Sequence, residues 1–143
     1  MADYMFHKVD YKNLNGRQKE NYNFQKMSAK LAEYGFNCLR LTDDYKGADF
    51  IACHIDGETF LKVQLKGRLE INRKYCNKNI YITFRHSIND NMVNYYIYEH
   101  DDFFNHACNS SEVENSQSWR ENGIYNWPNP PKWAQDYLSD KQL

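Results

Sequence analysis

The stretch Ala48–Lys66, ADFIACHIDGETFLKVQLK, decides the fold that the sequence predicts. It contains two runs rich in apolar and β-branched residues, which extend over Ala48–Ile55 and Glu58–Arg68. Asp56-Gly57 lies between them, and a two-residue link of this composition is typical of a tight turn between antiparallel strands. We therefore expect a β-hairpin in the first half of the chain.

The turn determines which side chains share a face of this hairpin. A two-residue turn places Phe50 opposite Val63 on an apolar face, and Asp49 opposite Gln64 on the other face. Lys66 is then diagonal to Asp49; directly opposed side chains lie about 5 Å apart and diagonal ones about 7–8 Å apart. A four-residue turn places Asp49 opposite Lys66 instead. In both registers a carboxylate, a carboxamide and an ammonium group lie on one face.

A helix is expected before the hairpin. Asn15 can cap its first turn together with Gln18, and Gly35 ends it after about Tyr34. Glu20 lies one turn before the apolar stripe of this helix and on the same face. An acidic residue in the first turn is favoured by the helix dipole. Glu20 could therefore stabilise the start of the helix, or it could act as a metal ligand. The apolar stripe consists of Phe24, Met27, Leu31 and Tyr34.

Further strands are expected on both sides of the hairpin. Phe36–Leu41 precedes it, and Asn79–His86 and Tyr95–His100 follow it. The link over residues 70–79 is too short for a full crossover helix, so we expect Asn79–His86 to return directly in the antiparallel sense. A short helix, capped by Asp101 or Asp102, then runs to about Cys108.

These elements predict the fold class α+β (α/β). The expected architecture is a mixed sheet of about five strands with an N-terminal helix packed on it and short C-terminal helices. We expect one domain over residues 1–143, with a core over 15–108. Residues 109–143 form a C-terminal clasp that holds all three Trp and all three Pro.

Composition excludes several classes of protein. Hydrophobic residues make up 41% and charged residues 26% of the chain, which is typical of a globular protein. No apolar run approaches the roughly 20 residues of a membrane span, and the N-terminus lacks a signal-peptide core, so we expect a cytoplasmic protein with no membrane partner. The four Cys form no C-x-x-C motif and are interpreted as free thiols. His100, His106 and Cys108 lack an obvious fourth ligand for a metal.

Charge is unevenly distributed along the chain. Residues 1–85 carry 15 Lys and Arg against 10 Asp and Glu, whereas residues 86–143 carry 3 against 9. A basic first part could meet phosphate groups, and a solvated surface with chance segregation explains the same numbers.

The polar face of the hairpin has the composition of a magnesium site. The carboxylate of Asp49, the amide oxygen of Gln64 and the backbone carbonyl of Leu65 are hard oxygen ligands of the kind that Mg²⁺ prefers. Lys66 could orient a metal-bound water or stabilise the charge that develops on a phosphodiester. Glu20 would add a second carboxylate if its helix packs against this end of the sheet.

The order of these residues resembles that of the PD-(D/E)XK nuclease superfamily, the restriction-endonuclease-like fold. The resemblance covers residues 15–86, with Asp49, Gln64 and Lys66 in the motif positions and Glu20 in the position of the helix acid. It implies an endonuclease that uses Mg²⁺, with Mn²⁺ as a substitute, to hydrolyse phosphodiester bonds in DNA during defence or repair. RNA is the alternative substrate. All four of these residues are then catalytic, and Asp49, Gln64, Leu65 and Glu20 form the metal site.

Two departures from the superfamily pattern support a second hypothesis. Gln64 removes one negative charge from the metal site, and residues 70–79 are too short for the helix that the superfamily usually places there. A third departure, Ala48 in place of the Pro of the motif, is tolerated in the superfamily. The alternative is therefore a catalytically degenerate module of the same fold that binds nucleic acid or a protein.

Partners are expected at two places on the chain. Nucleic-acid phosphates would be bound by basic residues near the exit of the hairpin, and such contacts are insensitive to sequence. A homodimer or larger complex would form through the clasp, and it predicts an exposed apolar patch around Trp119, Trp127 and Trp133. The basic residues are Lys62, Arg68, Arg73, Lys74 and Lys78.

Overall fold

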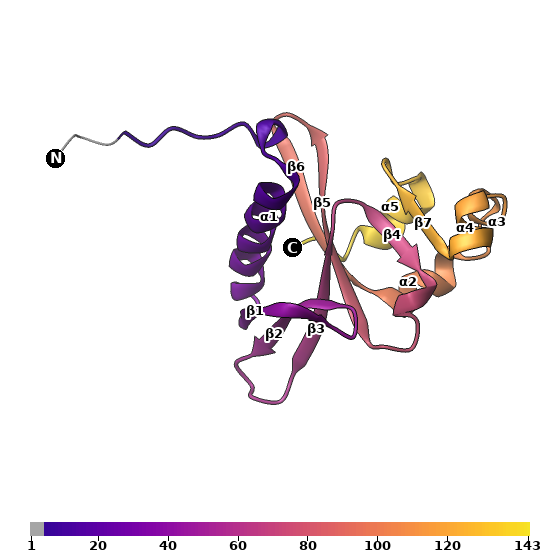
Figure 1. Ribbon diagram of the computed structural model, residues 1–143, viewed down its shortest axis with the longest axis horizontal. Helices are drawn as coiled ribbons and strands as arrows, with labels where there is room; N and C mark the ends of the chain where they lie inside the picture. Colours follow the sequence, from indigo (N-terminus) through magenta and orange to yellow (C-terminus); the bar gives the residue numbers. More distant parts are fainter. Residues whose placement is uncertain (1–4) are drawn as a thin grey trace.

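The computed structural model describes residues 5–143, and it contains a five-stranded mixed sheet (Figure 1). The spatial order of the strands is β1-β2-β3-β5-β6. The prediction of a mixed sheet with an N-terminal helix and short C-terminal helices is confirmed. The strands are β1 (Phe36–Tyr45), β2 (Ala48–His54), β3 (Phe60–Lys66), β5 (Ile80–Asn89) and β6 (Met92–Glu99).

The β2–β3 hairpin has the register that the two-residue turn predicts. Phe50 pairs with Val63, and the ladder continues to Cys53 and Phe60. The turn itself is longer, because the N–H of His54 donates to the carbonyl of Thr59 at 2.9 Å. The four residues 55–58 thus form a turn centred on Asp56-Gly57, and the strand pairing is unchanged.

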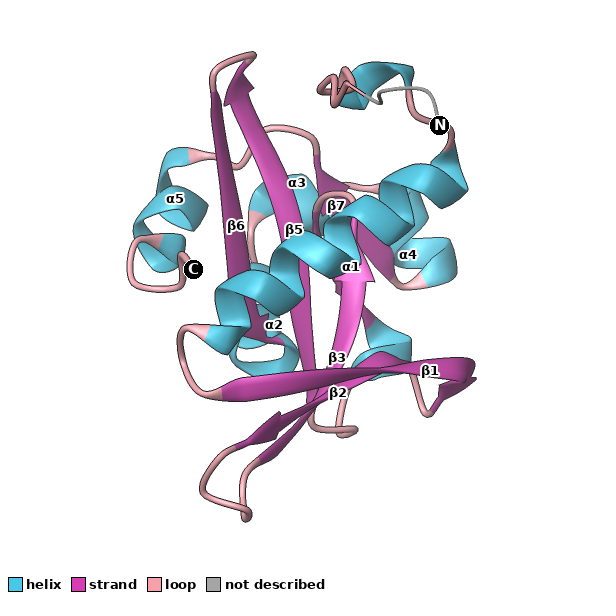
Figure 2. Cartoon of the chain, turned by 90° about the vertical axis from the view of Figure 1, so that its left-hand side faces the viewer, coloured by secondary structure: helices cyan, strands magenta, loops and turns pink. Residues whose placement is uncertain are grey.

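Helix α1 (Gly16–Ala32) lies against one face of the sheet (Figure 2). Its start is as predicted: Asn15 and Gln18 form a reciprocal capping box. Its buried side chains include Leu31, which packs in one apolar cluster with Phe50 and Val63. Phe50 and Ala52 of β2 and Val63 of β3 therefore face α1.

The prediction of an antiparallel return after the hairpin is wrong. β3 and β5 are parallel, with Lys66 opposite Phe84 at the end of the ladder. The crossover consists of a short strand, β4 (Leu69–Asn72), and a 3-10 turn, η2 (Arg73–Tyr75). β4 pairs antiparallel with β7 (Ile124–Trp127), so a strand that is stabilised by the C-terminal segment takes the place of a crossover helix.

The C-terminal elements cover the face of the sheet that α1 leaves open (Figure 1). α2 begins at His100 with no side-chain cap, although the sequence predicts a cap at Asp101 or Asp102. The buried cluster on this side takes in side chains from both 15–108 and 109–143. The remaining elements are α2 (His100–Ala107), α3 (Ser111–Glu114), α4 (Gln117–Asn122), α5 (Lys132–Leu138) and, near the N-terminus, η1 (Tyr11–Asn13).

The aromatic residues of the clasp belong to this cluster. Trp119 and Trp127 are each 5% exposed, and Trp133 is half-buried. The exposed patch that a clasp-mediated complex predicts is therefore not found at these residues, because their rings pack on Phe103, Phe104 and the sheet. Over residues 5–143, the helices are all too short or too polar to cross a bilayer.

Candidate functional site

The polar face of the hairpin points away from α1. Asp49, Gln64 and Lys66 alternate with the residues that contact α1, so they share the face of Ile82 and Phe84 on β5. The structure therefore brings the three motif residues to the side of the sheet that β4 and η2 cover. A site formed by these three side chains therefore lies between the sheet and the β4–η2 segment.

Asp49 is attached to the open edge of β3. Its Oδ2 accepts the backbone N–H of Leu65 at 2.8 Å, beyond the last ladder pair of the two strands. The N–H and C=O of one residue in an extended strand point to the same side, so the carbonyl of Leu65 also points toward Asp49. A side-chain carboxylate and a backbone carbonyl thus meet where β2 and β3 separate.

Gln64 has a buried oxygen atom without a partner. Its Oε1 is inaccessible to solvent and makes no hydrogen bond. An unsatisfied buried acceptor costs about 1–3 kcal/mol, and native proteins rarely keep one without compensation. A cation coordinated by this oxygen would supply that compensation, and the amide oxygen is a suitable hard ligand for Mg²⁺.

Lys66 is held as a cation. Its Nζ lies 3.2 Å from Oε2 of Glu70 and 5.2 Å from the ring centre of Tyr75. Burial lowers the pKa of Lys66, but hydrogen bonding to Tyr75 and the charge of Glu70 outweigh it, and the pKa is raised overall.

Glu20 does not join the other three residues. It lies on α1, on the opposite side of the sheet, and its Oε1 accepts from the guanidinium of Arg40 at 2.9 Å. Arg40 belongs to β1 and also lies over the ring of Phe24. The expectation that Glu20 adds a second carboxylate to the metal site is therefore not supported by its position. Helix periodicity places Glu20 on the buried side of α1, but it does not tell which face of the sheet that helix covers.

Two neighbours of Lys66 are not predicted from the sequence. Glu70 is on β4 and Tyr75 is in η2, and both elements belong to the crossover that was expected to be a direct return. The side chain of Glu70 is only 14% exposed, and a carboxylate is rarely buried to this extent unless it is paired with another group. The apolar residues Leu69, Ile71 and Tyr75 could have predicted an ordered element here, because apolar side chains at this spacing are typical of a buried segment. All three are buried in the structure.

The basic residues expected to bind nucleic acid are spread over β3 and the crossover. Lys62 is half-buried on β3, and Lys78 is exposed. Arg73 is already stacked on the ring of Trp119, 4.4 Å from its centre. The others have weaker contacts: Arg68 donates to Asn126 at 3.4 Å, and Lys74 lies 5.0 Å from the ring centre of Tyr75.

A second candidate for a metal site is unsuitable. Cys76, His100 and Asp101 place their ligand atoms within 4.8 Å of one another. However, Nε2 of His100 accepts the N–H of Asn72 at 3.0 Å, so Nδ1 carries the proton and donates to Asp101 at 3.1 Å. Both ring nitrogens are therefore used. Burial lowers the pKa of His100 more than Asp101 raises it, which keeps the ring neutral.

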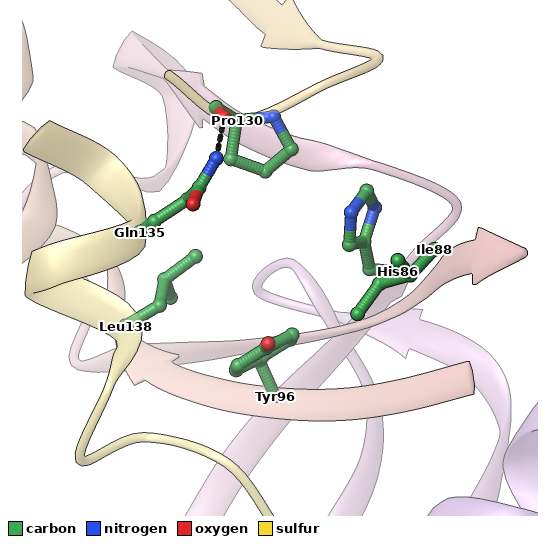
Figure 3. Close-up of a pocket in the computed structure, with 6 residues that line it drawn as sticks. All are labelled: His86, Ile88, Tyr96, Pro130, Gln135 and Leu138. Atoms are coloured by element: carbon green, nitrogen blue, oxygen red, sulfur yellow. Dashed lines mark hydrogen bonds between the residues drawn. The ribbon is translucent and has the colours of Figure 1, made fainter. Parts of the chain in front are cut away.

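A hollow of about 360 Å³ lies between the β5–β6 hairpin and the segment that contains α5 (Figure 3). Its walls include Ile88, Tyr96 and Leu138, and Gln135 donates to the carbonyl of Pro130 across one rim. In the part of the chain that the structure describes, no carboxylate lines it. It lacks the groups that phosphodiester hydrolysis requires, so Asp49, Gln64 and Lys66 remain the better candidate site.

Comparisons with protein-family models, with curated proteins and with solved structures found no match to this chain.

Proposed function

We propose that the protein is a Mg²⁺-dependent nuclease that hydrolyses phosphodiester bonds in DNA, with Asp49, Gln64 and Lys66 as its active site. Two observations support this proposal: the Asp49 carboxylate accepts the backbone N–H of Leu65 on β3, and Oε1 of the preceding residue, Gln64, is buried without a hydrogen-bond partner among the described residues. The proposal places the protein in the cytoplasm, in DNA defence or repair, with RNA as the alternative substrate.

The residues of the site would have separate roles in binding the metal ion and the phosphate. Asp49, Gln64 and the carbonyl of Leu65 would hold Mg²⁺, or Mn²⁺ in its place. When bound, the ion supplies an activated water and neutralises charge at phosphorus. Lys66 would bind a nonbridging phosphate oxygen, and its raised pKa keeps it charged for that task. Glu70 positions Lys66, since the ion pair holds the ammonium group close to the site.

Two features of the site favour an alternative function. Lys66 is already paired with Glu70, and Gln64 gives the site one negative charge fewer than a pair of carboxylates. Both features would suit a catalytically degenerate module that binds nucleic acid without cleaving it. This alternative predicts binding that is independent of divalent metal.

The test is the substitution Asp49→Asn, with Asp90→Asn as the matched control on the exposed β5–β6 turn. The nuclease proposal predicts that Mn²⁺ binding by titration calorimetry and cleavage of a labelled DNA duplex are both lost in Asp49→Asn. We expect a fall of at least about 100-fold in cleavage rate, because a ligand of the ion is removed. Asp90→Asn keeps both properties.

Two results would contradict the nuclease proposal. If wild-type protein does not bind Mn²⁺, the oxygen atoms at the edge of β3 do not form a metal site. If wild-type protein binds DNA equally well with Mn²⁺ and with EDTA and never cleaves it, the degenerate module is the correct function.

A further inference from the structure

A polar hollow of about 260 Å³ lies immediately after the end of β3. The β3–β5 ladder ends at Lys66 and Phe84, after which β3 turns away at Gly67 while β5 continues through His86. The hollow occupies this divergence. In sheets with parallel strands, ligands bind at the carboxyl ends of strands, where neighbouring connections separate.

The charged groups that line this hollow are all basic or can become so. They are Arg68 after β3 and Arg85 and His86 on β5, and among the described residues no Asp or Glu lines the hollow. Asp10 and Asp90 border the neighbouring hollow on the other side of Arg85. Over residues 5–143, neither arginine forms an ion pair with a carboxylate within 4.0 Å.

Arg85 is held in place without having its charge balanced. Its guanidinium lies 3.7 Å from the centre of the Tyr11 ring, and its Nε is buried with no hydrogen-bond partner. Tyr11 is fixed in turn, because its hydroxyl accepts from Asn23 at 2.9 Å. A partly buried cation with an unused donor is costly unless an anion completes the site.

The hollow suits a phosphate group better than a nucleic-acid base. Base stacking needs a free aromatic face, but Arg85 covers Tyr11, and Trp127 is 5% exposed. Arginine pairs with phosphate oxygens through two parallel N–H groups, so Arg68 and Arg85 can hold one phosphate between them. Arg68 is exposed at the rim, which leaves the hollow open to an extended chain.

We propose that Arg68 and Arg85 form a binding site for one backbone phosphate of the nucleic-acid substrate. The inference rests on the proposed nuclease function and extends it. The site begins one residue after Lys66, so a strand whose scissile phosphate meets Lys66 would place a neighbouring phosphate here. A free phosphate ion has the same chemistry and is separated from a nucleic-acid strand by the experiment.

The experiment measures binding of a fluorescein-labelled single-stranded oligonucleotide to the whole protein in EDTA, so that cleavage cannot contribute. The variants are Arg68→Gln and Arg85→Gln, with Arg120→Gln on α4 as a control of equal charge change. We expect about tenfold weaker binding for the first two and a change of less than about twofold for the control. The salt dependence, as log K against log salt concentration, loses roughly 0.7 from its slope for the one phosphate released.

Inorganic phosphate is the second probe, measured by titration calorimetry with the same variants. Equal binding of the oligonucleotide by Arg68→Gln and Arg120→Gln would overturn the proposal, and Arg68 is exposed, so its substitution leaves the fold intact. Loss of inorganic phosphate binding with unchanged oligonucleotide binding would also overturn it, because the site would then serve a free ion. Absence of cleavage in wild-type protein would refute the nuclease function and leave this binding result interpretable.

Discussion

At the scale of single residues, the hairpin arithmetic correctly predicted that Phe50 lies opposite Val63. Side-chain alternation in a strand has a period of two, so a centred turn at Asp56-Gly57 determines the faces of the residues that pair in the two strands. Glu20 was placed wrongly because the sequence contains no comparable constraint between a helix and a sheet. Its salt bridge with Arg40 depends on packing that neither segment encodes alone.

The unsatisfied oxygen of Gln64 leads to a prediction at this scale. Gln64→Glu introduces a second carboxylate near Asp49, which repels it in the absence of metal and attracts a divalent cation. We expect a lower melting temperature in EDTA, about tenfold tighter Mn²⁺ binding, and recovery of the melting temperature when Mn²⁺ is added.

Gln25→Glu, at an exposed position of α1, is the matched control. It adds the same charge and should change neither quantity. If Gln64→Glu binds Mn²⁺ no better than wild-type protein does, Oε1 of Gln64 is not a ligand.

At the scale of elements, the crossover shows where prediction from sequence failed. The length of residues 70–79 correctly excluded a helix, but it did not exclude a parallel connection made of a short strand. β4 is stable because β7 pairs with it and because Leu69 and Ile71 are fully buried. Both causes lie in residues far along the chain, so a window around 69–72 could not reveal them.

His100 joins α2 to this crossover and gives the fold a pH dependence. Its pKa is lowered from 6.5 in the folded protein by burial. The unfolded chain therefore binds more protons below that pH, and stability that is present above about pH 6.5 is lost as the pH falls through the folded pKa. The free energy of unfolding should fall by up to about 1.4 kcal/mol per pH unit in this range.

Urea denaturation between pH 7 and pH 5 measures this dependence. In His100→Gln the slope should be smaller, because the variant cannot bind the proton, and the remaining slope includes His86, whose pKa is also lowered by burial. His106→Gln, at an exposed position, is the control and should retain the wild-type slope. Equal slopes in all three proteins would show that folding does not lower the pKa of His100.

At the scale of the whole molecule, the C-terminal segment completes the main hydrophobic core. Its residues Val113, Trp119, Trp127, Ala134 and Leu138 share one cluster with Ile82 and Phe84 of β5. The concentration of Trp and Pro after residue 118 indicated a packing segment. It did not indicate the surface on which that segment packs, since aromatic residues fit many apolar surfaces.

This shared core predicts cooperative unfolding. All three Trp lie in residues 119–133, so their fluorescence reports on the C-terminal segment, while far-UV circular dichroism reports on every helix and strand. We expect both signals to give the same midpoint in urea, because the segment cannot leave without exposing the core of the sheet. A fluorescence transition at lower urea would mean that the segment unfolds separately.

The pairing of β4 with β7 has a consequence for synthesis on the ribosome. β4 leaves the exit tunnel long before its partner strand is translated, so its hydrogen-bonding edge and the apolar side chains of Leu69 and Ile71 stay uncovered during that interval. Uncovered strand edges attract other strands. A nascent chain stalled before residue 124 should therefore be a substrate for chaperones, and release of the finished polypeptide ends that vulnerability.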